Sequence, residues 1–522
     1  GGGVIRLLNN SEICTTSGTC GTATTGGGDI VLAGGAASSA DAARPGGFAA
    51  GFGTTSNNTG TSTMTGVQIG TQQRAGQGAR LYSAGGQITI RGAGATANST
   101  DRPTGIDVVA NSVINSGAGQ IQIDAEYRSS NAGQRTIEFS AWGGSGTTTI
   151  TSTNTSSSAV VIRSSTAAGA AAGNLGMSAN TTVFNVGGGL VFEAERINTA
   201  LNFTFNVSGP LVFRPFATTL LNQSAETSFE LPSSVAFTSN PSSITIGSST
   251  NTSPIIVSEN LQTTSGNIEL LTSAAISKTS ATLTAANELI INSRSGSVAT
   301  GSGALSATSV RIEAGTTVAL EGNITAGASG TLVRSGGRIT GSSGSNADNP
   351  LLISTRGGPI TLWTTGSAGG VAFANSTQLN TTQSGAAGAD ITIGGGSAMT
   401  ADVSRPSGPA SSNAGHGVQL GATAAAASSF VVRAGTGAFS ASGAYTATSP
   451  SAFSGIHFPL GQDINAGTIT LNGTTTYNAA NDSAAGINSY FTTATVASLI
   501  HATRAFEISG DAIRITGSSA SN

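Results

Sequence analysis

Five short apolar runs recur between residues 267 and 353: Asn267-Ile-Glu-Leu-Leu271, Glu288-Leu-Ile-Ile291, Ser309-Val-Arg-Ile312, Thr331-Leu-Val333 and Leu351-Leu-Ile353. Steps of 21, 21, 22 and 20 residues separate their lead apolar residues, which are Ile268, Leu289, Val310, Leu332 and Leu352. A β-type run this short cannot bury its apolar side alone, so repeats of this length must stack on their neighbours. The spacing therefore predicts a parallel β-solenoid whose successive coils lie about 4.8 Å apart.

The composition favours one long repetitive object over several globular domains. Of 522 residues, 74 are Gly and only 9% are charged, against about 25% in an average soluble protein. The net charge of −3 is too small to keep the chain disordered by self-repulsion. The chain has no basic cluster of the kind that binds nucleic acid, and no apolar run near the ~18–20 residues that cross a membrane. We therefore expect neither a nucleic-acid partner nor a membrane span.

Longer repeats flank the 21-residue array. Before it, Gly-x-Ile-x-Ile runs alternate with polar excursions and Gly-aliphatic returns, as in Gly86-Gln-Ile-Thr-Ile90 and Gly105-Ile106. After it, apolar runs spaced by 39, 39 and 37 residues begin at Ile391, Phe430, Ile469 and Phe506. Strict alternation places the Ile residues on one inner face. The sequence thus predicts an all-β parallel β-helix with long Gly/Ser/Ala-rich loops, such as 33–65 and 92–104, and no substantial helix.

We divide the chain by the character of its repeats. The predicted segments are an entry segment with a cysteine loop (1–30), a continuous β-solenoid (31–515) and a tail (516–522). Within the solenoid we distinguish long-loop coils (31–180), Phe-rich wider coils (181–240), regular coils of about 21 residues (241–355) and coils of about 39 residues (356–515). Eight of the 18 Phe lie between residues 184 and 237, which indicates a wider core there. A separate β-sandwich insertion is the alternative for that segment.

Both cysteines lie in one short segment, Cys14-Thr-Thr-Ser-Gly-Thr-Cys20. The glycine in this loop lets the two ends fold back on each other, so we expect a local disulfide. Such bonds form in oxidising compartments, which favours an extracytoplasmic protein. Two reduced thiols are the alternative, and a metal site would need more Cys or His than this segment has.

The rungs resemble those of a known class of bacterial surface proteins. Gly-x-Ile-x-Ile runs alternate with units such as Ala281-Thr-Leu-Thr-Ala285 and Leu305-Ser-Ala-Thr-Ser-Val-Arg-Ile312. This alternation resembles the filamentous-haemagglutinin type of exoprotein. The resemblance implies a right-handed parallel β-helix, secreted or displayed at the cell surface, that acts in adhesion, aggregation and biofilm.

Carboxylate pairs are the strongest candidates for chemistry, because parallel β-helices also carry polysaccharide lyases and hydrolases. Asp124 and Glu126 form one pair, and Glu193 and Glu195 the other. The i, i+2 spacing puts both carboxylates of a pair on one strand face, where they could hold Ca²⁺ or act as acid and base. Arginines follow both pairs directly, at positions 128 and 196, which favours solvated ion pairs. We therefore predict no catalytic residues and no metal or cofactor site.

Histidine and tryptophan give weaker signals. A coil of about 39 residues could bring His416 near His457, with His501 further on, but single polar residues at bends explain them better. Trp142 and Trp363 are expected to cap the core rather than to stack on sugars.

The ends of the chain suggest self-association. Alternating apolar strands stand at both ends, Val4-Ile-Arg-Leu-Leu8 at one and Phe506-Glu-Ile508 with Ala512-Ile-Arg-Ile515 at the other, and no polar cap is evident. Contact between unlike ends does not close, so it propagates as a filament. The alternative is that neighbouring coils of a longer chain cover both ends.

The sequence hypothesis is a non-enzymatic, extracellular structural or adhesive fibre subunit. Its expected partners are copies of itself and surface glycans or other cells, and its expected location is the surface or surroundings of a bacterium. The alternatives are a polysaccharide-degrading β-helix enzyme and an ice-binding solenoid. Thr-x-Thr motifs of the ice-binding kind occur only in fragments such as Thr61-Ser-Thr63.

Overall fold

A computed structural model describes residues 3–16, 19–37, 45–51, 64–71, 77–96, 104–129, 135–140, 146–167, 170, 174–177, 181–198, 203–222, 227–231, 235–341, 349–366, 369–373, 375–398, 406–408, 410–412, 416–421, 430–446, 453–458, 462–475, 487–490, 499–510 and 513–516. Regular structure in these ranges is β, apart from one short 3-10 turn, η1 (Gln383–Gly385). No helix in the described ranges is long and apolar enough to cross a bilayer. The chain forms two compact units, an N-terminal unit (1–266 and 270–272) and a C-terminal unit (267–269 and 273–522). The prediction of an all-β chain is confirmed.

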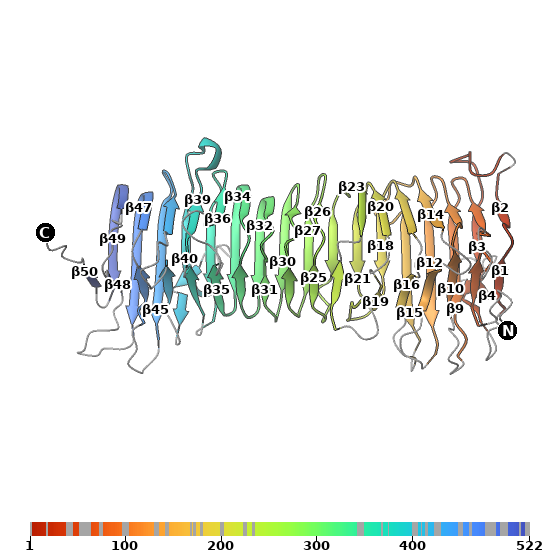
Figure 1. The fold of residues 1–522 in the computed structure, drawn as a ribbon, viewed down its shortest axis with the longest axis horizontal. Coiled ribbons are helices and arrows are strands. Elements are labelled where there is room, and N and C mark those ends of the chain that lie inside the picture. Colours follow the sequence, from red (N-terminus) through yellow and green to blue (C-terminus); the bar gives the residue numbers. More distant parts are fainter. Residues whose placement is uncertain are drawn as a thin grey trace. The chain divides into compact units, whose positions relative to one another are not determined.

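In the N-terminal unit the chain adds strands in turn to three parallel sheets (Figure 1). The first sheet contains β1 (Ile5–Leu7), β7 (Val67–Ile69), β10 (Ile106–Val109), β13 (Arg135–Ser140), β16 (Asn174–Met177) and β19 (Arg196–Ile197). The second contains β2 (Glu12–Cys14), β8 (Arg80–Tyr82), β11 (Val113–Asn115), β14 (Thr147–Ser152), β17 (Thr181–Val186), β20 (Phe203–Val207) and β23 (Ala236–Ser239). The third contains β3 (Ile30–Leu32), β9 (Ile88–Ala93), β12 (Ile121–Tyr127), β15 (Val160–Thr166), β18 (Leu190–Glu193), β21 (Leu211–Arg214) and β24 (Ile244–Gly247).

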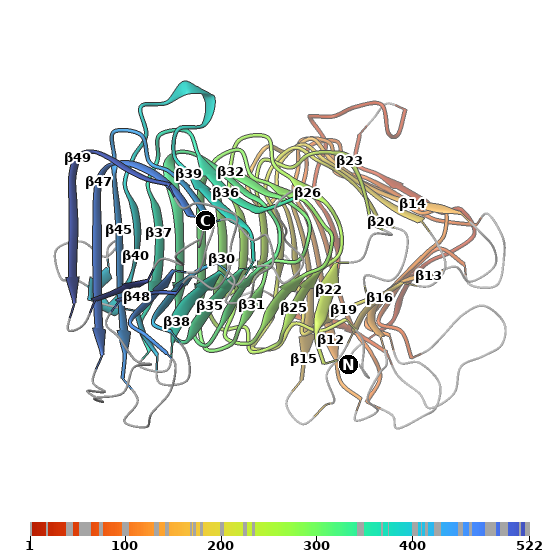
Figure 2. The ribbon, with the colours of Figure 1, turned by 60° about the vertical axis from the view of Figure 1, so that its left-hand side comes forward.

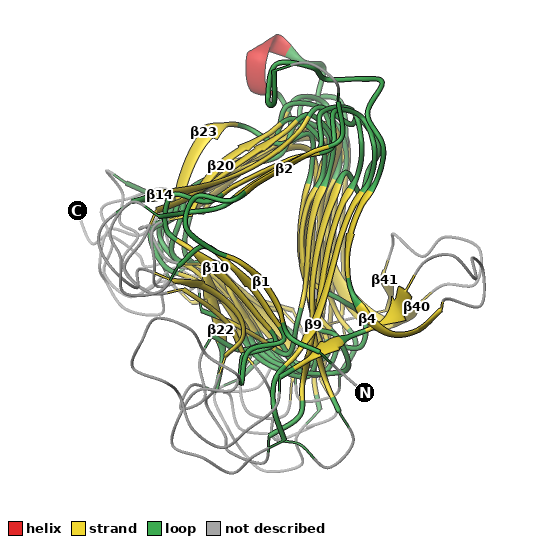
Figure 3. Ribbon diagram, turned by 90° about the vertical axis from the view of Figure 1, so that its right-hand side faces the viewer, coloured by secondary structure: helices red, strands yellow, loops and turns green. Residues whose placement is uncertain are grey.

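The three sheets of the N-terminal unit form three separate sides, carrying β1 and β10, β2 and β14, and β9 (Figure 3). Shorter strands complete this unit: β4 (Gly34–Ala37), β5 (Pro45–Gly47), β6 (Ala49–Ala50), β22 (Phe229–Leu231), β25 (Ile255–Val257) and β26 (Leu261–Gln262). Strand β27 (Ile268–Thr272) contains residues of both units. The predicted excursion 33–65 is thus not entirely a loop, because its described part holds β4, β5 and β6.

Side-chain alternation builds a continuous core in the third sheet of the N-terminal unit. Ile88 pairs with Ile121 and Ile90 with Ile123, and all four side chains are fully buried. The residues between them are only partly buried. The parallel, in-register pairing therefore places each buried Ile next to a buried Ile of the neighbouring strand, as the alternation predicts.

Phenylalanine rings fill the core of the same sheets. Strands β17, β18, β20 and β21 pair in parallel with their neighbours, so this segment continues the sheets rather than forming an inserted sandwich. Phe192 stacks on Phe213 with ring centroids 5.1 Å apart, and Phe184 on Phe205 at 5.6 Å. Phe237 is only partly buried, and Phe216, which lies beyond the end of β21, has 40% of its surface exposed.

The C-terminal unit also has three strips of parallel strands. The first contains β28 (Ile276–Lys278), β31 (Val298–Ala299), β33 (Val318–Leu320), β35 (Arg338–Gly341), β38 (Gly370–Phe373), β43 (Val418–Leu420), β46 (Ile456–Phe458), β48 (Ile487–Tyr490) and β50 (Ile513–Thr516). The second contains β30 (Glu288–Ser293), β32 (Leu305–Ala314), β34 (Ile324–Ser335), β37 (Ile360–Thr364), β40 (Ile391–Ala398), β45 (Ala438–Tyr445), β47 (Gln462–Thr475) and β49 (Leu499–Gly510). The third contains β29 (Leu283–Thr284), β36 (Leu351–Thr355), β39 (Thr377–Asn380) and β44 (Phe430–Arg433).

Long strands join two of these strips. Strand β34, for example, pairs with β36 through its first residues and with β37 through its last, so the pairing in this sheet closes into a ring. Figure 2 shows β37, β40, β45, β47 and β49 side by side in chain order. Strands β41 (Pro406–Gly408) and β42 (Ala410–Ser412) complete the unit.

The register within the 21-residue array differs in part from the prediction. Leu289 pairs with Val310 as predicted, but Val310 pairs with Thr331 and not with Leu332. Strand β34 carries extra residues before this pair, and Gly330 accommodates them with a φ of 84°, which glycine adopts most easily. Leu332 consequently points away from the core.

Two predicted rung residues belong to a different strip. Leu352 lies in β36, which pairs with the first part of β34 and with β39. Phe430 lies in β44, which pairs with β39 and β47. The ladder that starts at Ile391 instead continues through Phe439, Ile469 and Phe506. The repeat that follows β40 contains two apolar strands, β44 and β45. Spacing in the sequence does not show which of the two pairs with β40.

One local arrangement occurs in both units. Strands β4 and β5 form an antiparallel hairpin in which Gly34 pairs with Gly47 and Ala37 with Pro45. Strands β40 and β41 form another with the same register, Gly395 with Gly408 and Ala398 with Pro406. The next short strand pairs in parallel with the following rung in both cases, β6 with β9 and β42 with β45. This correspondence indicates a duplicated structural segment.

Candidate functional site

The last strands of the C-terminal unit leave core positions uncovered. In the described part of the chain, β49 pairs only with β47, and β50 only with β48. Three exposed residues pair with buried ones: Ile500 with Ile464, Phe506 with Ile469 and Ile513 with Ile487. The exposed fractions of these three side chains are 42%, 48% and 47%, whereas their partners are 0–1% exposed. We name Ile500, Phe506 and Ile513 the open edge, since each lacks only the next layer of strands.

The first strands of the N-terminal unit also form an edge, although Ile30 and Leu32 on β3 are already buried there. In the described ranges β1 pairs only with β7, β2 with β8 and β3 with β9. Ile5, Leu7 and Ile13 on these strands are half-buried, while their partners on β7 and β8 are fully buried. This edge also presents unpaired backbone groups in parallel orientation.

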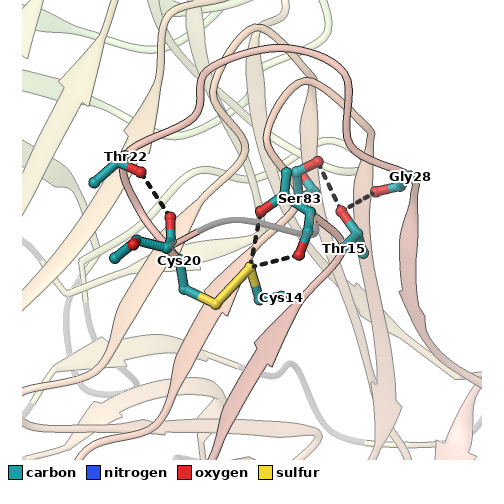
Figure 4. The surroundings of a disulfide bond; sticks show 8 residues. Cys14, Thr15, Cys20, Thr22, Gly28 and Ser83 are labelled. Atoms are coloured by element: carbon teal, nitrogen blue, oxygen red, sulfur yellow. Dashed lines mark hydrogen bonds between the residues drawn. A yellow bond between two sulfur atoms is a disulfide. The ribbon is translucent and has the colours of Figure 1, made fainter.

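The expected disulfide joins Cys14 and Cys20, with Cα atoms 5.7 Å apart, at the end of β2 (Figure 4). Next to it, the Thr15 hydroxyl lies 2.9 Å from the carbonyl oxygens of both Gly28 and Ser83. The Thr15 N–H also donates to the carbonyl of Tyr82. The loop is therefore closed by its own disulfide and is also hydrogen-bonded, through Thr15, to the neighbouring strand β8 and the residue after it.

The predicted carboxylates lie in a row of alternating charge on the third sheet of the N-terminal unit. Its members pair in register across five strands: Arg91, Asp124, Arg163, Glu193 and Arg214. Arg91 Nη2 lies 3.1 Å from Asp124 Oδ2. Glu193 Oε2 lies 3.0 Å from Arg163 Nη2 and 3.2 Å from Arg214 Nη2. We call this set the charge row.

The second carboxylate of each predicted pair is also engaged. Glu126 forms an ion pair with Arg128, as the sequence predicts. Glu195 accepts a hydrogen bond of 3.4 Å from the Thr166 hydroxyl. The partners of Glu193 come from the neighbouring strands rather than from Arg196. Within the described ranges, no group of three or more His, Cys, Asp or Glu side chains could hold a metal ion.

The structure brings two of the three histidines together. The rings of His416 and His457 stack with centroids 4.2 Å apart and planes within 8°, and both side chains are buried. The N–H of Ser454 donates to His416 Nδ1 at 3.0 Å, and Phe453 packs edge-on against the same ring. Burial, followed by the neighbouring His457 and Arg338, lowers the pKa of His416 to about 3. The interpretation of these two residues as single polar groups at bends is wrong, because their rings stack, although the residue that pairs with His457 in register is Gln419.

The remaining candidates are separate from these features. His501 lies exposed on β49. Trp363 is fully buried, and its Nε1 donates to the Gly396 carbonyl at 2.9 Å. Trp142 and the motif at 61–63 lie outside the described residues.

Sequence reasoning missed a buried polar row in the first sheet of the N-terminal unit. Gln68, Asp107 and Glu138 pair in register on β7, β10 and β13, and their exposed fractions are 0–2%. Arg135 forms an ion pair with Glu138. Gln68 and Asp107 directly follow a Gly-aliphatic return, so that motif could have pointed to them.

The duplicated segment repeats one element of this row. Gln68 Nε2 donates to the Gly70 carbonyl at 3.0 Å, and Gln419 Nε2 donates to the Gly421 carbonyl at 2.9 Å. The flanking sequences also agree, Gly66-Val-Gln-Ile-Gly70 against Gly417-Val-Gln-Leu-Gly421. In the second copy, Gln419 pairs with His457 where Gln68 pairs with Asp107.

Comparison with known proteins identifies no relative: no family model, no curated protein and no solved structure matches the chain. The interpretation of the open edge and the charge row therefore rests on the geometry of this chain.

Proposed function

We propose that the chain is a non-enzymatic, extracellular β-solenoid that serves as a structural and adhesive fibre subunit at a bacterial surface or in a biofilm matrix. The finer fold in this proposal is a right-handed parallel β-helix, in which one passage through three strips is one coil. The parallel ladders of both units support it, as do rungs that resemble those of filamentous-haemagglutinin-type exoproteins. The Cys14–Cys20 disulfide supports an oxidising, extracytoplasmic location.

The open edge is the observation that carries the proposal. Its three apolar side chains continue all three strips of the C-terminal unit, since the first part of β49 follows the third strip through Ile464 and Val432, the last part follows the second strip, and β50 follows the first. Burying a side chain of this kind contributes roughly 1.5–3 kcal/mol. A parallel strand layer is the partner that satisfies both the apolar side chains and the unpaired backbone groups of β49 and β50.

The first strands of the N-terminal unit offer such a layer. Strands β1, β2 and β3 lie in three sheets, are parallel to their neighbours and have one side unpaired in the described ranges. Contact between the open edge of one copy and these strands of another joins unlike surfaces. It therefore does not close and produces a filament.

The carboxylates fit a structural role. Asp124 forms an ion pair with Arg91, and Glu193 with Arg163 and Arg214, so both carboxylates link neighbouring strands. An exposed ion pair contributes little, about 0–1 kcal/mol, but a register shifted by one residue would place the two partners of each pair on opposite faces of the sheet. We propose that these groups fix strand register rather than serve as acid and base.

Electron microscopy of the 522-residue chain tests the proposal. We expect filaments that lengthen with protein concentration, and we expect Ile500→Lys/Phe506→Lys to abolish them. The control is Phe216→Lys, which adds one lysine at an exposed Phe of the N-terminal unit and leaves filaments intact. Single particles of the unsubstituted chain at high concentration, or filaments formed equally well by the double variant, would overturn fibre assembly.

A second assay addresses the rival enzymatic function. We expect no release of reducing or unsaturated sugar ends when the chain is incubated with a panel of polysaccharides. Cleavage that is lost in Asp124→Asn or Glu193→Gln would contradict the structural role of the charge row.

A further inference from the structure

A groove lies on the second strip of the C-terminal unit, where β30, β32 and β34 end. It encloses about 350 Å³, within the range of about 300–1,000 Å³ found for small-molecule sites. Its wall is a register row on three successive strands, Asn292, Glu313 and Arg334. Arg294 and Thr365 also line it.

Glycines hollow out this groove. A Cβ at Gly336 would lie 1.9 Å from the Gly315 carbonyl oxygen, and one at Gly315 would lie 2.5 Å from the Ser295 Cα. Neither position accepts a side chain, so the backbone itself forms the floor. The neighbouring rows of the strip carry side chains, which leaves the depression between them.

Arg334 is held in place before any ligand arrives. Its Cζ lies 4.8 Å from the ring centroid of Trp363, which pairs with it on β37. Trp363 is itself fully buried and anchored to the Gly396 carbonyl. The contact with the ring does not use the N–H groups of the guanidinium as hydrogen-bond donors to other polar atoms, so these groups can bind a ligand. No carboxylate in the described part of the chain forms an ion pair with Arg334.

The groove also provides acceptors. Asn292 Nδ2 donates to Glu313 Oε2 at 3.1 Å, which orients the carboxylate and leaves it further lone pairs for hydroxyl donors. Of the charged side chains that line the groove, Arg294 and Arg334 are basic and Glu313 is acidic.

We propose that this groove binds a hexuronate residue of an acidic polysaccharide. The Arg334 guanidinium binds the sugar carboxylate in a bidentate ion pair, and Glu313 and Asn292 form hydrogen bonds with ring hydroxyls. The site deepens the adhesive role proposed above by naming a ligand class, and it rests on that role only for its biological setting. Filament formation and sugar binding are measured separately, so either can fail alone.

The test is a titration with trigalacturonate, read by Trp363 fluorescence in a Trp142→Phe background that leaves one indole. We expect saturable binding that Arg334→Gln weakens at least about tenfold, since a charge-assisted hydrogen-bond pair contributes more than one such factor. Arg294→Gln, a second variant, should weaken binding in the same direction. Arg214→Gln removes an equal charge from the N-terminal unit and should leave binding unchanged. Near-ultraviolet circular dichroism checks that each variant is folded.

Each other outcome overturns the assignment. These outcomes are no binding by the Trp142→Phe protein, equal affinity for the neutral trigalactose, tighter binding of a sulfated trisaccharide, or an unchanged affinity in Arg334→Gln. An equal loss of trigalacturonate affinity in Arg214→Gln and Arg334→Gln would also overturn it, because binding would then depend only on the net charge of the protein.

Discussion

Acid titration of the C-terminal unit tests the stacked histidine pair. His416 is buried against His457, and its Nδ1 accepts the Ser454 N–H, an arrangement that requires a neutral Nδ1. Its pKa falls from 6.5 to about 3, mainly because burial opposes the charged form. The folded state therefore resists a proton that the unfolded state accepts readily.

The sign and size of the effect follow from this shift. Below pH 6.5 the unfolded chain binds a proton at this site and the folded chain does not, so stability falls as the pH drops towards 3. At about 1.36 kcal/mol per pKa unit, His416 alone lowers the free energy of unfolding by about 2 kcal/mol at pH 5 relative to pH 7.5.

The measurement is urea denaturation at pH 7.5 and pH 5, with Trp363 fluorescence reporting on the C-terminal unit in a Trp142→Phe background. His416→Gln is the matched variant, because its amide oxygen can still accept the Ser454 N–H but does not titrate. We expect the parent to lose about 2 kcal/mol more than the variant between the two pH values. Only the change with pH is compared, so a constant loss of stability in the variant cancels. Equal pH dependence in both proteins would refute the reasoning.

Two further predictions concern single side chains. Lys278, the one lysine of the chain, is buried with Nζ 2.7 Å from the Ala281 carbonyl and 2.6 Å from that of Gly303, and burial lowers its pKa to about 8. After chemical acetylation at pH 9, we expect mass spectrometry to find Lys278 unmodified in the native protein and acetylated in urea. Rapid acetylation of Lys278 in the native protein would contradict its burial. In the N-terminal unit, Phe205→Ala should lower the free energy of unfolding by about 3–5 kcal/mol, because Phe205 is fully buried. Phe216→Ala, at an exposed position, should lower it by about 0.5 kcal/mol or less. Equal losses of stability in urea denaturation of the two variants would contradict the packing described above.

Local sequence patterns were sufficient for several features. Alternation in Ile88-Thr-Ile90 identified both the strand and its inner face, because side chains of a strand alternate between its two sides whatever the strand pairs with. The short spacing of Cys14 and Cys20 predicted the disulfide, since the partners are neighbours in any fold. The Gly-aliphatic returns at Val418, Ile456 and Ile487 do align as one ladder.

Local sequence patterns could not predict features that depend on pairing between strands far apart in the chain. The charge row joins residues about thirty positions apart, and His416 stacks on His457 only because their rungs are adjacent. Neither set has a local motif. The open edge likewise became visible only when Phe506 was compared with its buried partner Ile469.

The sequence by itself therefore determined that this chain is built of β-strands with a defined inner face, while the tertiary structure decided which strand lies on which. Phe430 and Phe439 show the difference, since both stand in well-formed apolar strands, but only Phe439 joins the Ile391 ladder. An apolar pattern of period two is a property of one strand. The pairing partner is set by the lengths and conformations of the bends and excursions between strands, as at Gly330, and these leave no trace in the apolar pattern.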